Sequence, residues 1–422
     1  MEKFVIEGGF PLKGTVKISG AKNAALPLFA AAILLREPVV FTNVPDVADI
    51  YTMTELLAHL GVKVEKLEHG IWRLDASRIT STLAPYEIVR KMRASIYVLG
   101  PLLAREGEAK ASMPGGCAFG PRPIDFHIKG LQLMGADITL EHGYIVSKTQ
   151  KGHLHGATIA FDKKSVGATA HLMMAATLAD GQTVITNAAH EPEVVTLAEF
   201  LNACGAKISG HGTDEIKIVG VEDLHSPKEF EVIPDRIEAG TYAVAAFMTG
   251  GEVTLSDVRP EHMRAVIERL RAAGAEVDES DETLVVHKRG SKIKPVDIFT
   301  APYPGFPTDM QAQFMAMLSV AEGTSVIREG IYPDRFKHAF ELVRLGADIK
   351  VEDGMAIVKG VKELTGAPVI ATDLRASAAL VLAGLIAKGT TTVEHIYHLD
   401  RGYERFEEKL TLLGAHIKRV KV

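Results

Sequence analysis

The chain has 422 residues, of which 47% are hydrophobic and 24% charged, the composition of a globular protein with two or three domains. Its formal net charge of −6 argues against non-specific nucleic-acid binding. Its longest clean apolar run, residues 24–35, is shorter than the roughly 20 residues of a membrane span, so no membrane partner is expected. The sequence has only two cysteines, Cys117 and Cys204, and no recognisable secretion signal, which together favour a cytoplasmic protein.

Six alanine-rich segments are apolar on nearly all sides, which predicts helices that are buried all round. They span residues 23–35, 93–104, 167–179, 240–248, 310–320 and 375–387. A strand is predicted after each of them, as in Gly181–Ile185. A second helix with one charged face follows that strand, as in Glu261–Ala273, and is therefore expected at the periphery.

A Gly-Ala-like element closes each of these units and recurs every 68 to 74 residues. Its glycines are Gly61, Gly135, Gly205, Gly274, Gly346 and Gly414. Each glycine follows a helical pattern and suits the position just beyond a helix C-terminus. The alternation of apolar and polar residues after it predicts a β-hairpin.

The repeats predict an α/β protein made of six units, each of about 70 residues. We expect two domains of three units, with the buried helices inside and the sheets outside. Residues 1–20 are strands without a helix of their own, so they are expected to complete the second domain. The predicted domains are residues 21–229 and residues 1–20 with 230–422.

Cys117 lies in a loop with three glycines and three prolines in ten residues, 114–123. A free cysteine is usually a small buried hydrophobe, an interpretation that suits Cys204, whose place in the repeat is taken by Leu, Met or Ala elsewhere. For Cys117, the sequence supports a functional thiol as well as it supports a small buried hydrophobe. Arg122 is close enough in sequence to lower the pKa of that thiol.

Three further segments have a functional and a plain structural interpretation. Arg122 before Pro123 suits an anion site at a helix start or a solvated arginine. Residues 163–167 combine two lysines with a serine before a buried helix, which suits a diphosphate or simple capping. Asp309 at a helix start is either a functional carboxylate or an acid favoured by the helix dipole.

Three motifs resemble those of the enolpyruvyl transferases, and the resemblance extends from Phe4 to Val422. The motifs are Ser19–Pro27, Met113–Gly120 and Asp373–Ser377. The resemblance implies a pair of inside-out α/β barrels. No metal, cofactor or dinucleotide-binding signature appears in the sequence, so no metal or cofactor is expected. It also implies transfer of the enolpyruvyl group of phosphoenolpyruvate to the 3′-hydroxyl of UDP-N-acetylglucosamine, with release of phosphate, in peptidoglycan precursor synthesis.

The resemblance further implies roles for individual residues. It assigns catalysis to Cys117, Asp309 and Lys22, with Cys117 as the proton donor to C3 of phosphoenolpyruvate and Asp309 as the base. It assigns phosphoenolpyruvate contacts to Lys22, Asn23, Arg122, Arg375 and Arg401, and supporting roles to Arg335 and Asp373. It assigns UDP-N-acetylglucosamine contacts to Arg93, Arg122, Pro123, Ile124, Asp125, Phe126, Lys163, Lys164, Ser165, Val166, Gly167, Asp309 and Ile331.

Two alternatives stay open at this point. A 5-enolpyruvylshikimate-3-phosphate synthase would share the fold and the donor, although the cysteine loop and residues 163–167 count against it. A six-unit binding clamp without chemistry would share the architecture. If the thiol is functional, fosfomycin, an anionic epoxide, is expected to alkylate Cys117.

Overall fold

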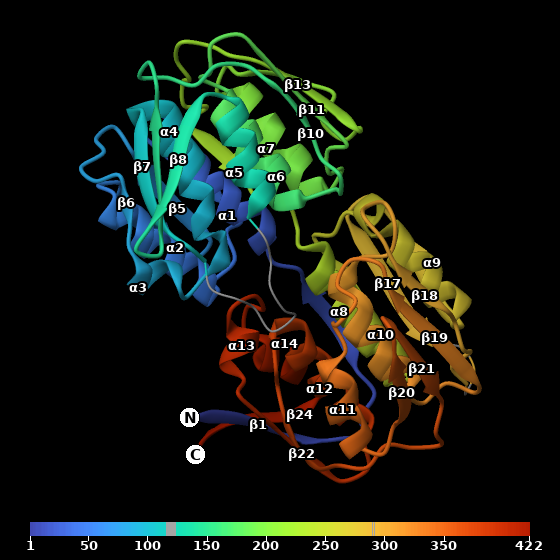
Figure 1. Ribbon diagram of the computed structural model, residues 1–422. Helices are drawn as coiled ribbons and strands as arrows, with labels where there is room; N and C mark the ends of the chain where they lie inside the picture. The colour runs from blue at the N-terminus through green and yellow to red at the C-terminus, as the bar shows by residue number, and fades with distance from the viewer. Residues whose placement is uncertain (115–123, 289, 291) are drawn as a thin grey trace. The chain divides into compact units, whose positions relative to one another are not determined.

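The computed structural model describes residues 1–114, 124–288, 290 and 292–422. These residues pack into two compact units (Figure 1). The first unit contains the described residues between 20 and 233, and the second contains residues 1–19 together with those from 234 to 422. Each unit has its own hydrophobic core.

The described strands form three four-stranded sheets in each unit. In spatial order, the sheets of the first unit are β14 (Glu229–Glu231), β3 (Val39–Thr42), β5 (Ile71–Asp75), β4 (Lys63–Glu68); β6 (Leu83–Ala84), β7 (Glu108–Ser112), β9 (Tyr144–Thr149), β8 (Ala136–Glu141); and β10 (Thr158–Ala160), β11 (Gln182–Thr186), β13 (Glu215–Val219), β12 (Lys207–Ser209). Those of the second unit are β16 (Ala275–Glu279), β17 (Thr283–Lys288), β15 (Glu252–Ser256), β2 (Lys13–Lys17); β18 (Ile298–Thr300), β19 (Thr324–Glu329), β21 (Met355–Lys359), β20 (Asp348–Glu352); and β22 (Pro368–Ile370), β23 (Thr390–Glu394), β1 (Glu2–Glu7), β24 (His416–Lys421).

All six sheets follow one pattern, shown here by the β10–β13 sheet. Edge strand β10 runs parallel to β11, and β13 pairs antiparallel with both β11 and β12. The hairpins predicted after Gly61, Gly135, Gly205, Gly274 and Gly346 are therefore present, whereas the one predicted after Gly414 is wrong, because β24 pairs there with the N-terminal β1. The sequence-based repeat was incomplete, because it lacked the edge strand. Apart from β2, which lies within the predicted N-terminal strands, these edge strands have two or three residues, too few for an alternating pattern to be recognised.

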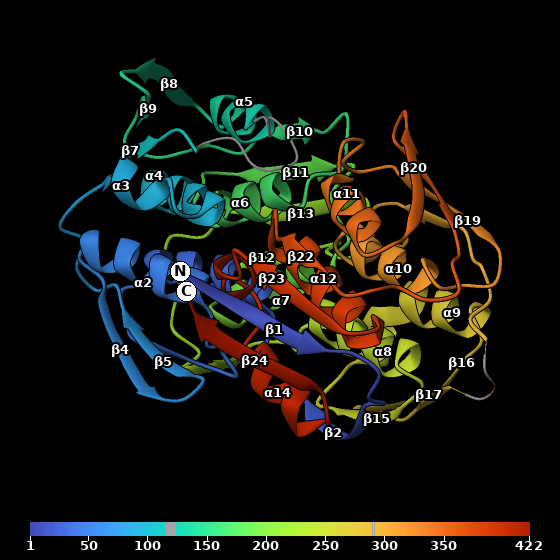
Figure 2. The ribbon, with the colours of Figure 1, turned by 90° about the horizontal axis from the view of Figure 1, so that it is seen from below.

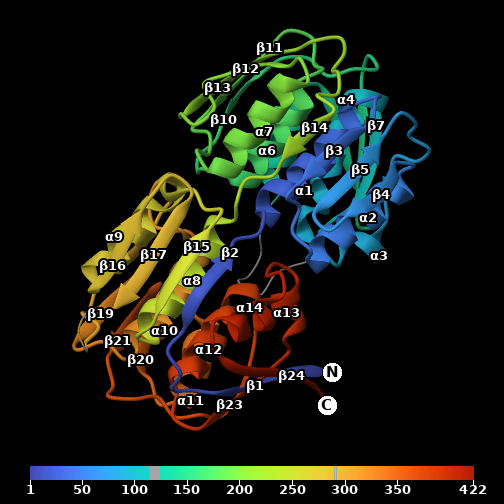
Figure 3. The same cartoon turned by 180° about the vertical axis from the view of Figure 1, so that it is seen from behind.

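A buried helix begins each unit of the repeat, as predicted. These helices are α1 (Lys22–Ala31), α4 (Leu99–Glu106) and α6 (Val166–Ala176) in the first unit, and α8 (Arg236–Met248), α10 (Gln311–Leu318) and α12 (Leu374–Ile386) in the second. Figure 1 shows α8, α10 and α12 side by side inside their sheets, and Figure 3 shows α6 beneath β10–β13. Two helices differ from expectation at their starts. The predicted segment 93–104 begins as a 3-10 helix, Arg93–Val98, before α4, and α8 begins at Arg236, four residues earlier than predicted.

The remaining helices are more exposed than the buried six, except α7, which is buried along most of its length. They are α2 (Ala48–His59), α3 (Tyr86–Val89), α5 (Asp125–Leu133), α7 (Pro192–Ala203), α9 (Arg264–Ala272), α11 (Lys337–Arg344), α13 (Tyr397–Asp400) and α14 (Phe406–Leu412). The six repeat glycines that end α2, α5, α7, α9, α11 and α14 have φ between 95° and 106°. This left-handed backbone explains why glycine recurs there.

The N-terminal strands complete sheets of the second unit, as expected from their lack of a helix. β1 lies between β23 and β24, and β2 pairs with β15. The two chain ends therefore lie side by side on β1 and β24 (Figure 2). The α/β class with helices inside and sheets outside is confirmed in each unit, although the three sheets remain separate in the described residues and form no closed barrel.

Candidate functional site

Asp309, Arg335 and Arg375 form a cluster in the second unit, which we call the Asp309 cluster. Asp309 lies just before α10, Arg335 just before α11, and Arg375 is the second residue of α12. One oxygen of Asp309 accepts a hydrogen bond from Nη1 of Arg335 at 2.9 Å, and the other lies 3.5 Å from Nη2 of Arg375. Both arginine side chains are about 95% buried, whereas that of Asp309 is 30% exposed. The carboxylate thus has buried cations behind it and an accessible edge.

Arg375 is held by its surroundings but keeps an unused donor. Its guanidinium lies 5.2 Å from the ring centre of Tyr403, whose hydroxyl is 2.8 Å from that of Thr241. Asp373 caps α12 by accepting from the backbone N–H groups of Arg375 and Ala376. Nη1 of Arg375 is buried without a hydrogen-bond partner among the described residues. A buried donor of this kind is costly unless a ligand completes it.

Glu329, the last residue of β19, organises a polar network behind the Asp309 cluster. Its carboxylate accepts from the hydroxyls of Thr300 at 2.8 Å and Thr308 at 2.9 Å, and from the amide of Gln311 at 3.2 Å. Gln311 also donates to the backbone carbonyl of Arg335 at 2.7 Å. Sequence reasoning missed this network. Its only signal was two glutamines, Gln311 and Gln313, in an otherwise apolar helix.

His338 belongs to the same network and makes it sensitive to acid. Its Nε2 lies 2.7 Å from the side-chain amide oxygen Oε1 of Gln311, and burial lowers the pKa of this histidine to about 4. In the unfolded chain the pKa of His338 is about 6.5, the ordinary histidine value. Between pH 6.5 and 4 the unfolded chain therefore binds more protons than the folded one. Stability contributed by neutral His338 is therefore present above pH 6.5 and lost as the pH falls.

We expect this loss to be about 3 kcal/mol between pH 6.5 and 4. Urea unfolding across this range should show a smaller fall for His338→Gln than for the unmodified protein, because glutamine does not titrate. Parallel curves for the two proteins would contradict the assignment.

In the first unit, Lys22 starts α1 and is nearly buried. Its ammonium forms an ion pair with Asp49 of α2 at 3.0 Å. Asn23, next to it, is exposed. The pairing explains how a lysine is accommodated at an apolar helix end.

Residues 163–167 surround the N-terminus of α6. The hydroxyl of Ser165 accepts from the N–H of Ala168 at 3.1 Å, so the predicted serine cap is confirmed. Lys163 is exposed, whereas Lys164 donates to the carbonyl of Ala188 and to Asp214. Val166 and Gly167 form the first turn of α6.

The other predicted residues lie at the edges of these elements. Arg93 begins the 3-10 helix before α4, and Ile124, Asp125 and Phe126 lie at the start of α5. In the second unit, Ile331 and Arg401 follow β19 and α13 and are half-buried.

Cys117, Arg122 and Pro123 lie outside the described residues. The second cysteine, Cys204, is buried in the core of the first unit, which confirms its assignment as a small hydrophobe. Burial raises the pKa of the Cys204 thiol to about 12.

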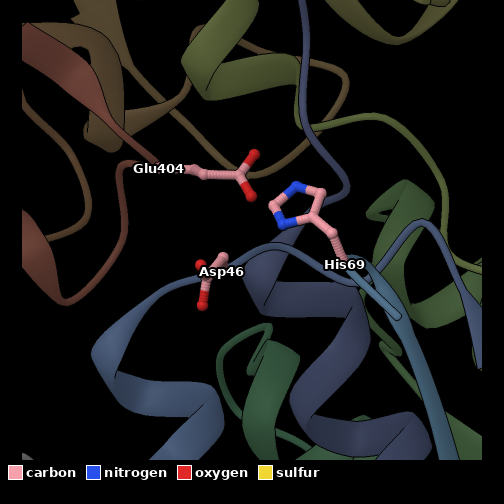
Figure 4. Close-up of side chains that lie close together, drawn as sticks. All are labelled: Asp46, His69 and Glu404. Atoms are coloured by element: carbon pink, nitrogen blue, oxygen red, sulfur yellow. The ribbon is translucent and has the colours of Figure 1, made fainter. Parts of the chain in front are cut away.

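Figure 4 labels three side chains of the types that bind metals. Asp46 precedes α2 and His69 follows β4 in the first unit, whereas Glu404 follows α13 in the second (Figure 4). They belong to different units, so no metal centre is inferred from them.

The chain is similar to known proteins over nearly its whole length. The family described as EPSP synthase (3-phosphoshikimate 1-carboxyvinyltransferase) matches residues 6–410. This chain belongs to that family of enolpyruvyl transferases. A crystal structure of the enolpyruvyl transferase NikO from Streptomyces tendae has a TM-score of 0.91 at 27% identity and covers 100% of this chain and 99% of its own. EPSP synthase from Acinetobacter baumannii, at 22% identity with both chains fully covered and a TM-score of 0.77, shows the shared fold alone.

Within the family, closely similar relatives carry one name, UDP-N-acetylglucosamine 1-carboxyvinyltransferase. The protein of this name from Nitratidesulfovibrio vulgaris is 54% identical, with 99% of each chain covered. That of Coxiella burnetii is 54% identical over 100% of this chain and 96% of its own, and that of Anaeromyxobacter sp. is 55% identical over both chains. Within the described part of the present chain, no helix has the length and apolar character to cross a membrane.

Proposed function

We propose that this chain transfers the enolpyruvyl group of phosphoenolpyruvate to the 3′-hydroxyl of UDP-N-acetylglucosamine and releases phosphate. The observation that carries the proposal is the 54–55% identity, over the whole length, to relatives named for this transfer. The reaction would supply peptidoglycan precursors, and the two cysteines are compatible with the reducing cytoplasm.

The chemistry we propose is an addition followed by an elimination. The carboxylate of Asp309 takes the proton of the sugar 3′-hydroxyl, and the hydroxyl oxygen forms a bond to C2 of phosphoenolpyruvate. At the same time, the thiol of Cys117 gives a proton to C3. The thiolate left on Cys117 then takes a proton from C3 as the C2–O bond to phosphate breaks, which restores the double bond and releases phosphate. General acid–base groups of this kind each contribute about 10²–10⁴-fold.

The anionic donor needs cations, for which we propose Lys22, Arg122, Arg375 and Arg401, with Asn23 beside Lys22. The support within the described residues is the unpartnered Nη1 of Arg375, a buried donor that suits a phosphate or carboxylate oxygen. Arg335 and Asp373 would hold other site residues in place, since Arg335 pairs with Asp309 and Asp373 caps α12.

The sugar nucleotide needs a site for its diphosphate, which we place at the N-terminus of α6. Lys163 is exposed there and the first-turn N–H groups of a helix favour anions. Proposed nucleotide contacts are Arg93, Arg122, Pro123, Ile124, Asp125, Phe126, Lys163, Lys164, Ser165, Val166, Gly167, Asp309 and Ile331.

Phosphate release from phosphoenolpyruvate tests the proposed acceptor. Release should occur with UDP-N-acetylglucosamine and be absent with shikimate 3-phosphate. The reverse pattern would favour a 5-enolpyruvylshikimate-3-phosphate synthase, and no release with either would favour a binding protein without chemistry.

Arg401→Ala should weaken the binding of phosphoenolpyruvate far more than the binding of the nucleotide, because the proposed partner of Arg401 is the small anion. Loss of a hydrogen bond to a charged group costs about 1.5–3 kcal/mol, or roughly ten- to more than a hundred-fold in the KM for phosphoenolpyruvate. Steady-state kinetics with each substrate varied in turn measure both constants. Equal losses for the two substrates would contradict the assignment.

A further inference from the structure

Two buried histidines on neighbouring helices of the first unit contact each other through their rings. His127 lies on α5 and His171 on α6, and their side chains are 6% and 0% exposed. Their Nδ1 atoms are 2.8 Å apart, a hydrogen-bond distance. One of these two nitrogens must therefore carry a proton and the other must accept it.

The backbone decides which nitrogen carries the proton. The N–H of Gly100 donates to Nε2 of His171 at 2.7 Å. Gly100 is the second residue of α4, so this N–H has no acceptor within its own helix. Since Nε2 of His171 accepts, the proton of the neutral ring lies on Nδ1, which donates to Nδ1 of His127. The proton of neutral His127 then lies on Nε2.

Burial keeps both rings neutral. It lowers the pKa of His127 to about 4, with a further contribution from the charge of Arg93, and lowers the pKa of His171 well below its ordinary value. Near neutral pH, His127 is thus an uncharged donor whose N–H direction is set by its neighbours.

The donor edge of His127 faces the first turn of α6. A Cβ atom placed on Gly167 would lie 3.4 Å from both Cε1 and Nε2 of His127 and 3.7 Å from the hydroxyl of Tyr97. No described residue accepts a hydrogen bond from Nε2 of His127. An N–H on a side chain that is more than nine-tenths buried is thus directed to the helix end where we place the diphosphate.

We propose that His171 is a positioning residue, which holds His127 in the Nε2–H tautomer so that His127 donates a hydrogen bond to a diphosphate oxygen of the nucleotide. The proposal rests on the proposed function for the identity of this ligand. The tautomers themselves do not depend on it, because they follow from contacts within the free protein.

Nitrogen-15 NMR of the imidazole rings tests the tautomers directly. At pH 7, without ligand, His127 should be protonated at Nε2 only and His171 at Nδ1 only. A proton on Nδ1 of His127, or a doubly protonated ring, would overturn the proposal. UDP-N-acetylglucosamine should then shift the Nε2 signal of His127. Saturating nucleotide that leaves this signal unchanged would also overturn it.

Two amide variants of His171 separate positioning from packing. His171→Asn keeps an N–H donor near the place of Nδ1, whereas His171→Gln keeps an acceptor near Nε2 for Gly100 and loses the donor to His127. We expect His171→Gln to raise the KM for UDP-N-acetylglucosamine about two- to tenfold, the size of one ordinary hydrogen bond, with kcat and the KM for phosphoenolpyruvate unchanged. His171→Asn should stay within about twofold.

Equal effects of the two variants, or a parallel rise in both KM values, would show that His171 only packs. If neither variant folds, the spectra of the unmodified protein still decide the proposal. Failure of the proposed function is a separate result. In that case the unmodified protein would not bind UDP-N-acetylglucosamine, while the tautomers of the free protein would be as stated.

Discussion

Asp309→Asn should retain UDP-N-acetylglucosamine binding and lose about 10²–10⁴-fold in kcat, the range expected for removal of a general base. Asparagine keeps the shape of the side chain and an oxygen that accepts from Nη1 of Arg335, as the carboxylate does at 2.9 Å. It cannot take the proton of a hydroxyl. Phosphate release measures the turnover, and calorimetry measures the binding of the nucleotide.

A matched control is Asp281→Asn, which makes the same change at an exposed aspartate between β16 and β17. Its turnover should be unchanged. Thermal unfolding of both variants shows whether loss of the carboxylate beside Arg335 and Arg375 affects the fold. Near-normal turnover of a folded Asp309→Asn protein would mean that Asp309 is only a first-turn acid.

Fosfomycin should alkylate Cys117 and leave Cys204 unmodified. The thiolate is the reactive form. An ordinary cysteine with a pKa of roughly 8.5 is about one-quarter ionised at pH 8, whereas burial raises the pKa of Cys204 to about 12 and leaves about one thiol in 10⁴ ionised. The difference in thiolate is on the order of 10³-fold, and burial in the core also blocks access to Cys204. Peptide mass mapping after treatment locates the adduct.

Two substitutions of Cys117 test its role as a proton donor. Cys117→Asp should resist the drug and retain some turnover, because a carboxylic acid can still give a proton to C3. Cys117→Ser should be much less active, since a serine hydroxyl is a poor acid near neutral pH. An adduct on Cys204, or full inactivation of Cys117→Asp by the drug, would exclude the proposed role.

The six repeats could be predicted because each one depends on short-range patterns. A helix that is apolar on all sides must be buried, and the turn after an outer helix requires a left-handed residue, as Gly61 and Gly414 show with φ near 100°. Apart from β2, which lies within the predicted N-terminal strands, the edge strands that run parallel to their neighbours could not be predicted. The smallest, Leu83–Ala84, is a strand only because it pairs with β7, so its signal lies in the partner rather than in its own residues.

For the candidate site, the sequence by itself determined which residues are present and the family to which they belong, because motifs such as Asp373–Ser377 are contiguous. Only the tertiary structure decided their partners. Asp309 meets Arg375 across 66 positions of sequence, and His127 meets His171 across 44. Contacts of this kind depend on which helices pack together. Burial then sets the chemistry, since a histidine removed from water stays neutral and a cysteine in the core stays protonated.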